Sequence, residues 1–457
     1  MMVAVALLLV ALSYGHKLSC STLGAGIGNT ADRYDTHVYR LACYSDTLTL
    51  FNLRDLGSHV FPYVHGWYTA IPLPAVHGGT VEYPTLTGVW VWLSALPVSS
   101  AAGFLTVTAL TFLPVVALTV LWLQQVAGRR AWIFAATPPL LLYGLYNWDL
   151  LPVAATAAGL AIALAGPRRW SPLTRAVIAA VAFGIGGAFK LYPVMFAAPL
   201  ALTFLFDQSA PARSRVGNCL AVLGAAAATL LAANLPFMLI NFDGWLSVFQ
   251  FQAHRMIGAS TLSVWYWGLL PWSASPTGTT QHLMGLLATG ATALGLLLVL
   301  AAAAIIGKRR GSVPWIGAAA AMLCVYMVFN KVNSLQYVLW LLPFFAVLRI
   351  RLAWIIAYFV MDLAAFIGWY RVLFYTSLGN LEPTWANQAL AIGVWGRAGL
   401  LLALIVTFLQ ATPTSPNTRD GRRSVHQAAD MPSTSAVPPS IALSDGLGDS
   451  LVPTGRR

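Results

Sequence analysis

Long apolar segments, separated by short polar ones, follow one another from the first residues of the chain to about Gln410. They are of helix length, and they lack the short alternation of apolar and polar positions that is typical of membrane-barrel strands. Inside a bilayer, backbone groups must find hydrogen-bond partners within the protein, which a helix provides from its own segment. The pattern therefore predicts an all-α, polytopic integral membrane protein.

The orientation of these segments follows from short basic clusters that lie between them. Lys and Arg concentrate in cytoplasmic loops of membrane proteins, so we place the clusters on the cytoplasmic side. They are Arg129-Arg130, Arg168-Arg169-Arg175, Arg213-Arg215, Lys308-Arg309-Arg310 and Arg349-Arg351. This assignment makes Gly15–Pro84 a long first extracytoplasmic loop, and Asn241–Gln281 a second outer loop.

The same assignment predicts a bundle of about twelve transmembrane helices. The segments are Met1–Tyr14, a surface helix from Thr85 to Pro97 with a span from about Gly103 to Val126, Trp132–Tyr146, Leu150–Ala165, Ala176–Phe189, Pro193–Phe206, Val216–Ile240, His282–Ile306, Val313–Asn330, Gln336–Leu348, Leu352–Tyr370 and Arg397–Gln410. Four central segments, between residues 132 and 206, are shorter than the roughly 20 residues that a perpendicular span needs. We expect them to meet in pairs at a cavity recessed below the outer surface.

Composition agrees with a membrane protein and defines a separate tail. Hydrophobic residues make up 58% of the chain and charged residues only 9%, against about 25% charged residues in soluble domains. The net charge of +12 is explained by topology and lipid headgroups, so no nucleic acid is expected as a partner. Residues 1–411 form one transmembrane domain, whereas 412–457 are rich in Ser, Pro and Thr and predict a disordered cytoplasmic tail.

Polar chemistry is concentrated on the predicted outer side. Of the ten carboxylates before the tail, eight fall there, whereas Asp207 is cytoplasmic and Asp362 lies within a helix. Cys20 and Cys43 share the first outer loop, where a disulfide and two free thiols are both compatible with the sequence. Because ionisable groups inside or next to a bilayer are costly, the outer helix ends are the expected functional region.

Five segments at the outer helix ends carry most of this polar chemistry. They are Cys43-Tyr44-Ser45-Asp46, Glu82-Tyr83-Pro84, Asn147-Trp148-Asp149, Phe189-Lys190-Leu191-Tyr192-Pro193 and the stretch from Phe329 to Tyr337. A carboxylate with several cations suits glycosyl transfer from a polyprenyl phosphate. The carboxylate removes the proton of an acceptor hydroxyl, and the cations stabilise the leaving phosphate. Lys190, Lys331 and Arg255 are the candidate phosphate ligands, the last with a fork that matches phosphate oxygens.

These segments resemble the GT-C superfamily of membrane glycosyltransferases, and within it glycosyltransferase family 87, whose bacterial members are polyprenyl-phosphate-mannose-dependent mannosyltransferases. The resemblance covers roughly Cys20 to Gln410. It rests on the five segments above with Phe61-Pro62-Tyr63, Leu86-Thr87-Gly88, Leu150-Leu151, Gly244-Trp245 to Arg255 and Leu339-Trp340. The lysine and asparagine-lysine segments are also similar to the catalytic subunit of the eukaryotic GPI first mannosyltransferase.

The resemblance implies that an aspartate of the first outer loop is the acid-base residue, which corresponds to Asp46 in this chain, with Asp35 as the nearest rival. Glu82, Asp149, Tyr192 and Gln336 are expected to bind the sugar or the acceptor. The expected reaction moves mannose from polyprenyl phosphate mannose to an extracytoplasmic glycolipid or glycan at the cell membrane. An α1,2 linkage is one option, and arabinose as the sugar stays open.

Other interpretations fit some of these residues. Asp46 is also compatible with a solvated loop, Glu82 and Asp149 with helix capping, and Lys190 with snorkelling to the interface. At the level of the whole chain, the alternatives are a transporter or lipid flippase and a non-catalytic scaffold for envelope assembly. No metal-binding spacing and no nucleotide-binding loop is present in the sequence, so no cofactor is expected. A divalent ion bridging the donor phosphate remains compatible with it.

Overall fold

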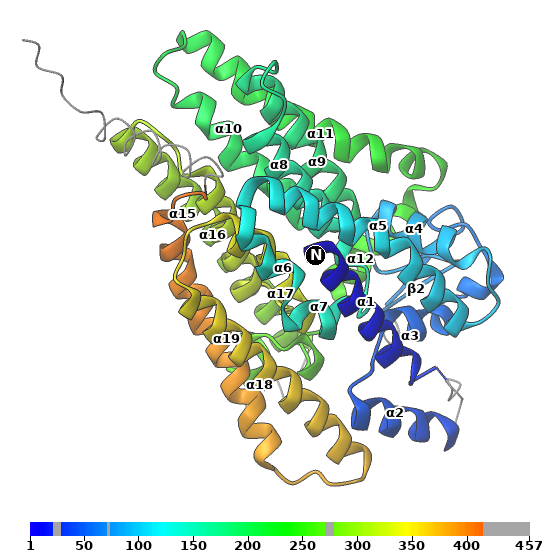
Figure 1. The fold of residues 1–457 in the computed structure, drawn as a ribbon. Helices are drawn as coiled ribbons and strands as arrows, with labels where there is room; N and C mark the ends of the chain where they lie inside the picture. The colour runs from blue at the N-terminus through cyan, green and yellow to red at the C-terminus, as the bar shows by residue number, and fades with distance from the viewer. Residues whose placement is uncertain (22–28, 71–73, 270–277, 415–457) are drawn as a thin grey trace, which may run out of the picture. The chain divides into compact units, whose positions relative to one another are not determined.

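The computed structural model describes residues 1–21, 29–70, 74–269 and 278–414. This part of the chain is mostly helical, with one two-stranded sheet (Figure 1). By length and composition, six of its helices can cross a membrane. They are α5 with α6 (Ala101–Ala135), α9 (Pro172–Phe189), α11 (Ala212–Ile240), α15 (Gly278–Arg310), α18 (Leu352–Ser377) and α19 (Trp385–Gln410).

Six further apolar helices are shorter than a perpendicular span requires. They are α1 (Met2–Leu18), α4 (Thr85–Ala95), α8 (Leu150–Ala165), η3 with α10 (Tyr192–Leu205), α16 (Trp315–Phe329) and η5 with α17 (Leu335–Val347). The expected surface helix before Pro97 corresponds to α4, and the span after it to α5. The tail expected over 412–457 lies outside the described residues from 415 onward.

The segment expected as a loop over Gly15–Pro84 contains several short elements. These are α2 (Asn29–Leu41), α3 (Asp46–Leu53), the 3-10 turn η1 (Leu56–Ser58) and the antiparallel strands β1 (Trp67–Thr69) and β2 (Ala75–His77). Helix α3 begins where the Ser45 hydroxyl accepts the backbone N–H of Thr47, a standard N-cap. This segment is therefore built from folded elements that can hold side chains in place.

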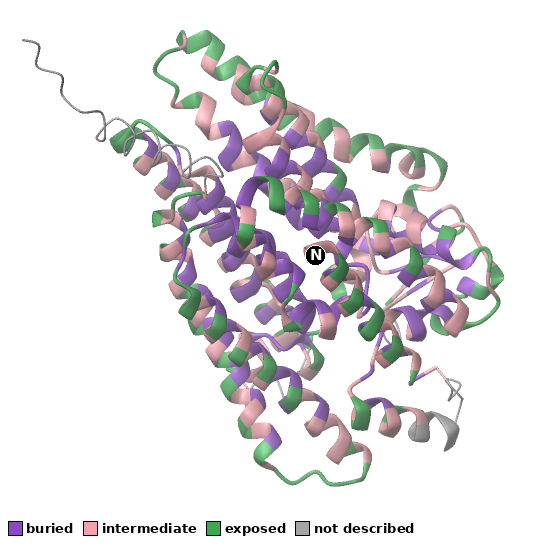
Figure 2. Cartoon of the chain, in the orientation of Figure 1, coloured by how far each residue is buried: buried purple, intermediate pink, exposed green. Residues whose placement is uncertain are grey.

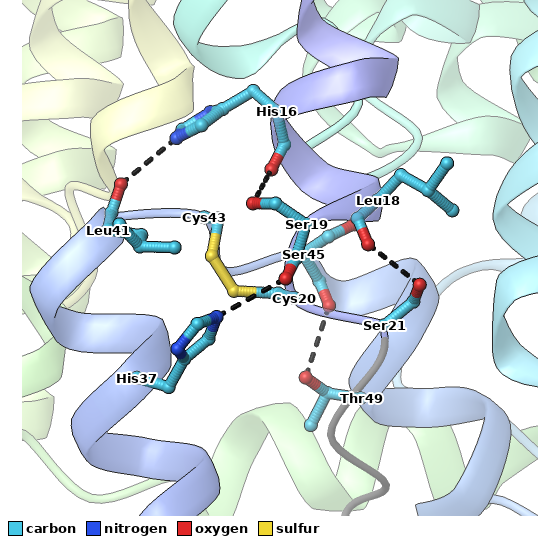
Figure 3. The surroundings of a disulfide bond; sticks show 10 residues. All are labelled: His16, Leu18, Ser19, Cys20, Ser21, His37, Leu41, Cys43, Ser45 and Thr49. Carbon is cyan, nitrogen blue, oxygen red and sulfur yellow. Dashed lines mark hydrogen bonds between the residues drawn. A yellow bond between two sulfur atoms is a disulfide. The ribbon is translucent and has the colours of Figure 1, made fainter.

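A disulfide between Cys20, which follows α1, and Cys43 joins the end of that helix to the chain shortly before α3. Figure 3 shows that hydrogen bonds accompany it: His16 donates to the Leu41 carbonyl and His37 to the Ser19 carbonyl. The cross-link thus ties the chain just ahead of Asp46 to α1. The sequence is compatible with either a disulfide or two free thiols at these cysteines, and the structure contains the disulfide.

Two short helices replace the single segment expected over Trp132–Tyr146. They are α6 (Trp132–Ala135) and α7 (Pro138–Tyr143), which follow the 3-10 turn η2 (Gly128–Ala131). Pro138 and Pro139 occupy the first positions of α7, where prolines are tolerated, but they cannot continue α6. The break lets the chain turn before Asn147.

The core of the bundle lies around α16 and α17, whose residues are almost all buried (Figure 2). Helices α11 and α15 are the least buried of the six. Only 11% and 17% of the residues in their most apolar segments are buried. Leucines on both remain exposed, among them Leu220 and Leu297. Apolar side chains that are exposed over most of a helix are stable in hydrocarbon. These two helices are therefore the natural lipid-facing surfaces.

Several basic clusters lie at one end of the bundle. Arg130 donates hydrogen bonds to the carbonyls of Phe345, Ala346 and Leu348 at the end of α17. Gln125 near the end of α5 donates to Ala165 at the end of α8. These contacts bring the ends that precede Arg129, Arg168 and Arg349 to one level, as the positive-inside pattern predicts.

Candidate active site

A cavity of about 850 Å³ lies where the short elements of residues 29–84 meet the helix ends. Its walls come from α3, the chain before α4, η3, α12 (Phe242–His254), the loop after α16, η5 and α18. Seven of the eight residues singled out in the sequence line it, namely Asp46, Glu82, Lys190, Tyr192, Arg255, Lys331 and Gln336. The eighth, Asp149, is buried next to Lys190. The expected convergence of distant segments is therefore present.

Asp46 is held in the first turn of α3 by contacts on both its backbone and its carboxylate. Its N–H donates to the Tyr146 carbonyl at 2.8 Å, and the adjacent Ser45 hydroxyl donates to Leu145. Tyr44 donates to Oδ1 at 2.8 Å and Tyr83 donates to Oδ2 at 2.6 Å. These bonds fix the carboxylate at the cavity wall, which differs from a freely solvated loop side chain.

Burial raises the pKa of Asp46 above its ordinary value. The hydrogen bonds from Tyr83 and Tyr44 act in the opposite direction, as does the Lys190 ammonium, whereas the nearby Glu82 raises the pKa further. Burial disfavours the charged form of a carboxylate, and donated hydrogen bonds favour it. A carboxylate with a raised pKa is a stronger base than an ordinary aspartate, which suits proton abstraction near neutral pH.

Lys190 and Asp149 form an ion pair beside the cavity. Helix α9 ends at Phe189, and the extended Lys190 places Nζ 2.5 Å from Oδ1 of Asp149. Trp340 donates its indole N–H to the same oxygen at 2.7 Å. The ammonium also lies 5.1 Å from the Trp340 ring centroid, a cation–π distance. Asp149 makes no side-chain cap bond to α8, so it pairs with Lys190 and does not cap that helix.

Arg255 and Lys331 form a second cationic group, which no carboxylate of the described residues neutralises. Arg255 follows α12, and within the described residues its guanidinium forms no hydrogen bond or ion pair. Lys331 donates to the Ala253 carbonyl at 3.0 Å. Burial and the Arg255 charge lower the pKa of Lys331 to about 8. Two adjacent cations with unused donors form a site suited to an anion such as a phosphate.

Glu82 takes part in a separate ion pair with Arg54, which follows α3. Its Oε2 atom is buried and has no hydrogen-bond partner, while its backbone carbonyl accepts from Gln252 at 2.8 Å. Pro84, not Glu82, is the N-cap residue of α4. The side chain therefore packs at the cavity wall and does not cap that helix.

Three stacked aromatic rings form part of the cavity wall beside Lys190. Trp340 stacks between Tyr192 and Tyr337, with ring centroids 4.2 and 3.7 Å away. The Tyr192 hydroxyl and Oε1 of Gln336 are buried without a hydrogen-bond partner. This wall therefore combines a rigid stack with unused polar atoms, a combination that suits a sugar.

The family model described as Mannosyltransferase (PIG-M) matches residues 170–409, which is more than half of the chain. The chain belongs to this family. PIG-M mannosyltransferases are part of the GT-C superfamily, so membership implies a membrane glycosyltransferase with a lipid-linked sugar donor and an acceptor. With its apolar helices, the chain is a multi-pass membrane protein. No curated protein matches the chain.

The PIG-M match divides the cavity residues into two groups. The cations Lys190, Arg255 and Lys331 lie inside the matched segment, together with Tyr192 and Gln336. Asp46, Glu82 and Asp149 precede it. The family match therefore covers the three cations and leaves the carboxylates to be judged from geometry.

Several contacts of this site are not readable from the sequence. Tyr44 and Tyr83 stand next to the singled-out carboxylates, but nothing in their spacing indicates that both donate to Asp46. The pairing of Arg54 with Glu82 and the contact of Trp340 with Asp149 join residues far apart in the chain. Over the described residues, no group of three or more His, Cys, Asp or Glu side chains is placed to hold a metal ion.

Proposed function

We propose that this chain transfers a mannosyl residue from polyprenyl phosphate mannose to a glycolipid or glycan acceptor on the extracytoplasmic side of the cell membrane. The observation that carries the proposal is one cavity lined by a fixed carboxylate, Asp46, and by the unneutralised cations Arg255 and Lys331. Membership of the PIG-M family supports the sugar, and the motif resemblance supports assignment to glycosyltransferase family 87 with α-mannosyl transfer.

In this mechanism Asp46 is the general base. Its carboxylate takes the proton of the acceptor hydroxyl as that oxygen forms a bond to the anomeric carbon. The bond from the anomeric carbon to the phosphate oxygen breaks, and its electron pair stays on the phosphate. Tyr44 and Tyr83 hold the two carboxylate oxygens, which reduces the freedom that Asp46 would lose on reaching the transition state.

The phosphate gains negative charge as it leaves, so the cations stabilise the transition state more than the bound donor. Arg255 and Lys331 have no carboxylate partner within the part of the chain that the structure describes, and they are the primary phosphate ligands. Lys190 adds a third positive charge, held in place by Asp149. Glu82, Tyr192 and Gln336 retain unused polar atoms at the wall and bind the sugar or the acceptor, with Asp149 supporting them through Lys190.

The location of the cavity suits a lipid-linked donor. Leu191, Val248 and Phe249 line the same cavity as the cations and offer apolar surface to the isoprenoid chain. The Cys20–Cys43 disulfide close to Asp46 is typical of an oxidising compartment, which favours an extracytoplasmic active site. The basic helix ends on the other side of the bundle agree with this orientation.

A transfer assay tests the proposal. Membranes containing the wild-type chain, Asp46→Asn or Asp243→Asn are incubated with radiolabelled polyprenyl phosphate mannose, and label in glycolipid and glycan fractions is counted. Asp243 is an exposed carboxylate in the first turn of α12 and serves as the matched control. We expect Asp46→Asn to lower transfer by roughly 10²–10⁴-fold, with Asp243→Asn unchanged. Full activity of Asp46→Asn, or an inactive wild type, would contradict the proposal.

A further inference from the structure

A buried ion pair joins the helices α18 and α19, which run side by side (Figure 1). Arg397 Nη1 lies 3.1 Å from Oδ1 of Asp362, and the side chains are 1% and 3% exposed. Neither residue lines the cavity. Charges inside a membrane helix are costly unless paired, so a pair at this depth is a candidate for a functional role.

The two helices approach closely where this pair forms. A side chain at Gly393 would collide with the backbone of Ala365, and one at Gly368 would collide with the backbone of Leu390. Close backbone packing through glycines leaves little room for either helix to shift. The ion pair is therefore a fixed point within the bundle.

From this fixed point, one contact reaches the loop that carries Lys331. Arg397 Nη2 donates to the Asn333 carbonyl at 3.0 Å. The N–H of Asn333 donates in turn to the Thr261 carbonyl at 2.8 Å. The loop between α16 and η5 is thus held from two sides, two residues beyond Lys331.

A second contact reaches the loop that supports Asp46. The Tyr143 hydroxyl donates to Oδ2 of Asp362 at 2.7 Å. Tyr143 ends α7, and the carbonyls of Leu145 and Tyr146 that follow it accept hydrogen bonds from Ser45 and Asp46. The two oxygens of one carboxylate are therefore linked to the two loops, Oδ1 through Arg397 and Oδ2 through Tyr143.

We propose that Asp362 and Arg397 are positioning residues that set the base, Asp46, relative to the phosphate ligand Lys331. The inference rests on the proposed function. Transfer requires the acceptor oxygen at Asp46 and the leaving phosphate at Lys331 to stay in line, and errors of about 1 Å lower rates strongly. One ion pair that bonds to both supporting loops keeps that separation constant without contacting either substrate.

Two mild substitutions separate the two contacts. Arg397→Lys retains a charge for Asp362 but lacks the planar fork that also reaches Asn333. Tyr143→Phe retains the ring, which packs against Tyr146 and Phe366, and removes only the bond to Asp362. Tyr358→Phe is the matched control, because Tyr358 is a buried tyrosine of α18 whose hydroxyl has no hydrogen-bond partner.

The test measures kcat and the KM for polyprenyl phosphate mannose in purified wild type and the three variants, with thermal stability recorded for each. We expect Arg397→Lys to raise the donor KM roughly tenfold and Tyr143→Phe to lower kcat roughly tenfold, since each loses a hydrogen bond in which one of the two groups is charged. Tyr358→Phe is expected to match wild type in both constants. Changes confined to stability, or the same kinetic change in all three variants, would overturn the inference.

A binding measurement keeps this outcome separate from the proposed function. Polyprenyl phosphate alone is titrated into wild type and Arg397→Lys in nanodiscs, and its dissociation constant is determined. Weaker binding by the variant supports the inference, whether or not transfer of mannose is detected. An inactive wild type that binds the lipid phosphate contradicts the proposed reaction, whereas equal binding by both proteins contradicts the positioning role.

Discussion

At the scale of single residues, Asp46 is subject to opposing influences. Burial and Glu82 raise its pKa, while hydrogen bonds from Tyr83 and Tyr44 and the Lys190 charge lower it, and the net change is upward. With its pKa raised, the carboxylate is more basic than that of an exposed aspartate, which suits a general base. Each of these contributions can be removed separately by substitution.

Removal of the Tyr83 hydroxyl tests this balance. Tyr83 donates to the ionised form of Asp46, so Tyr83→Phe raises the pKa of Asp46 further. Because Asp46 must be ionised to act as base, the acid limb of the kcat/KM profile moves to higher pH. Tyr68→Phe, which removes a buried hydroxyl without a partner, is the control and leaves the profile in place. An acid limb that moves to lower pH in Tyr83→Phe contradicts the assignment.

Lys331 predicts an alkaline limit to donor binding. Its pKa is lowered to about 8 by burial and the Arg255 charge, so the ammonium is present below about pH 8 and lost above it. Donor affinity is therefore expected to fall as pH rises through this value. Lys331→Arg keeps its charge in this range, and the alkaline fall in kcat/KM for the donor should disappear. An unchanged alkaline limb in Lys331→Arg would remove Lys331 from donor binding.

The sequence predicted which residues gather at the cavity better than it predicted their partners. Asp46, Glu82, Lys190, Arg255 and Lys331 could be placed at one level because basic clusters determine the side of every helix end. The Lys190–Asp149 pair and the two tyrosines on Asp46 depend on how helices pack, which residue spacing does not encode. Their roles in catalysis stay predictions until the variants are measured.

At the scale of elements, the helix bounds predicted from the sequence agree best with the structure for uninterrupted apolar segments. The helix expected over Leu150–Ala165 has those bounds, whereas the one expected from Arg397 begins at Trp385. A charge normally ends an apolar segment, but Arg397 lies within α19. Its charge is matched by Asp362 on α18, a pairing that the local sequence does not reveal.

The disulfide is the element-scale feature with the clearest consequence. Cys20 and Cys43 are 23 positions apart in the sequence, and their disulfide ties the chain just before α3 to the end of α1. Replacement of both by Ser is expected to lower the free energy of unfolding by about 3 kcal/mol, seen as a lower apparent Tm, and to reduce transfer because Asp46 follows closely. Cys219→Ser, which removes a free thiol, is the control. An unchanged Tm and activity in the double variant contradict a role for the cross-link.

At the scale of the whole molecule, the account requires the cavity and the basic helix ends to lie on opposite sides of the membrane. Ser58, in the outer segment, and Ser214, near the start of α11, are both exposed and can be replaced by Cys. A membrane-impermeant maleimide applied to whole cells should label Ser58→Cys and leave Ser214→Cys unlabelled until the cells are permeabilised. The reverse pattern would place the active site in the cytoplasm.

The central claim is that donor phosphate and catalytic base share one cavity. An experimental structure of the protein with polyprenyl phosphate mannose, in which Asp46→Asn blocks turnover, tests it directly. We predict phosphate density in contact with Arg255 and Lys331, with the sugar between that phosphate and residue 46. Density for the phosphate elsewhere in the bundle, with this cavity occupied only by solvent, would contradict the account.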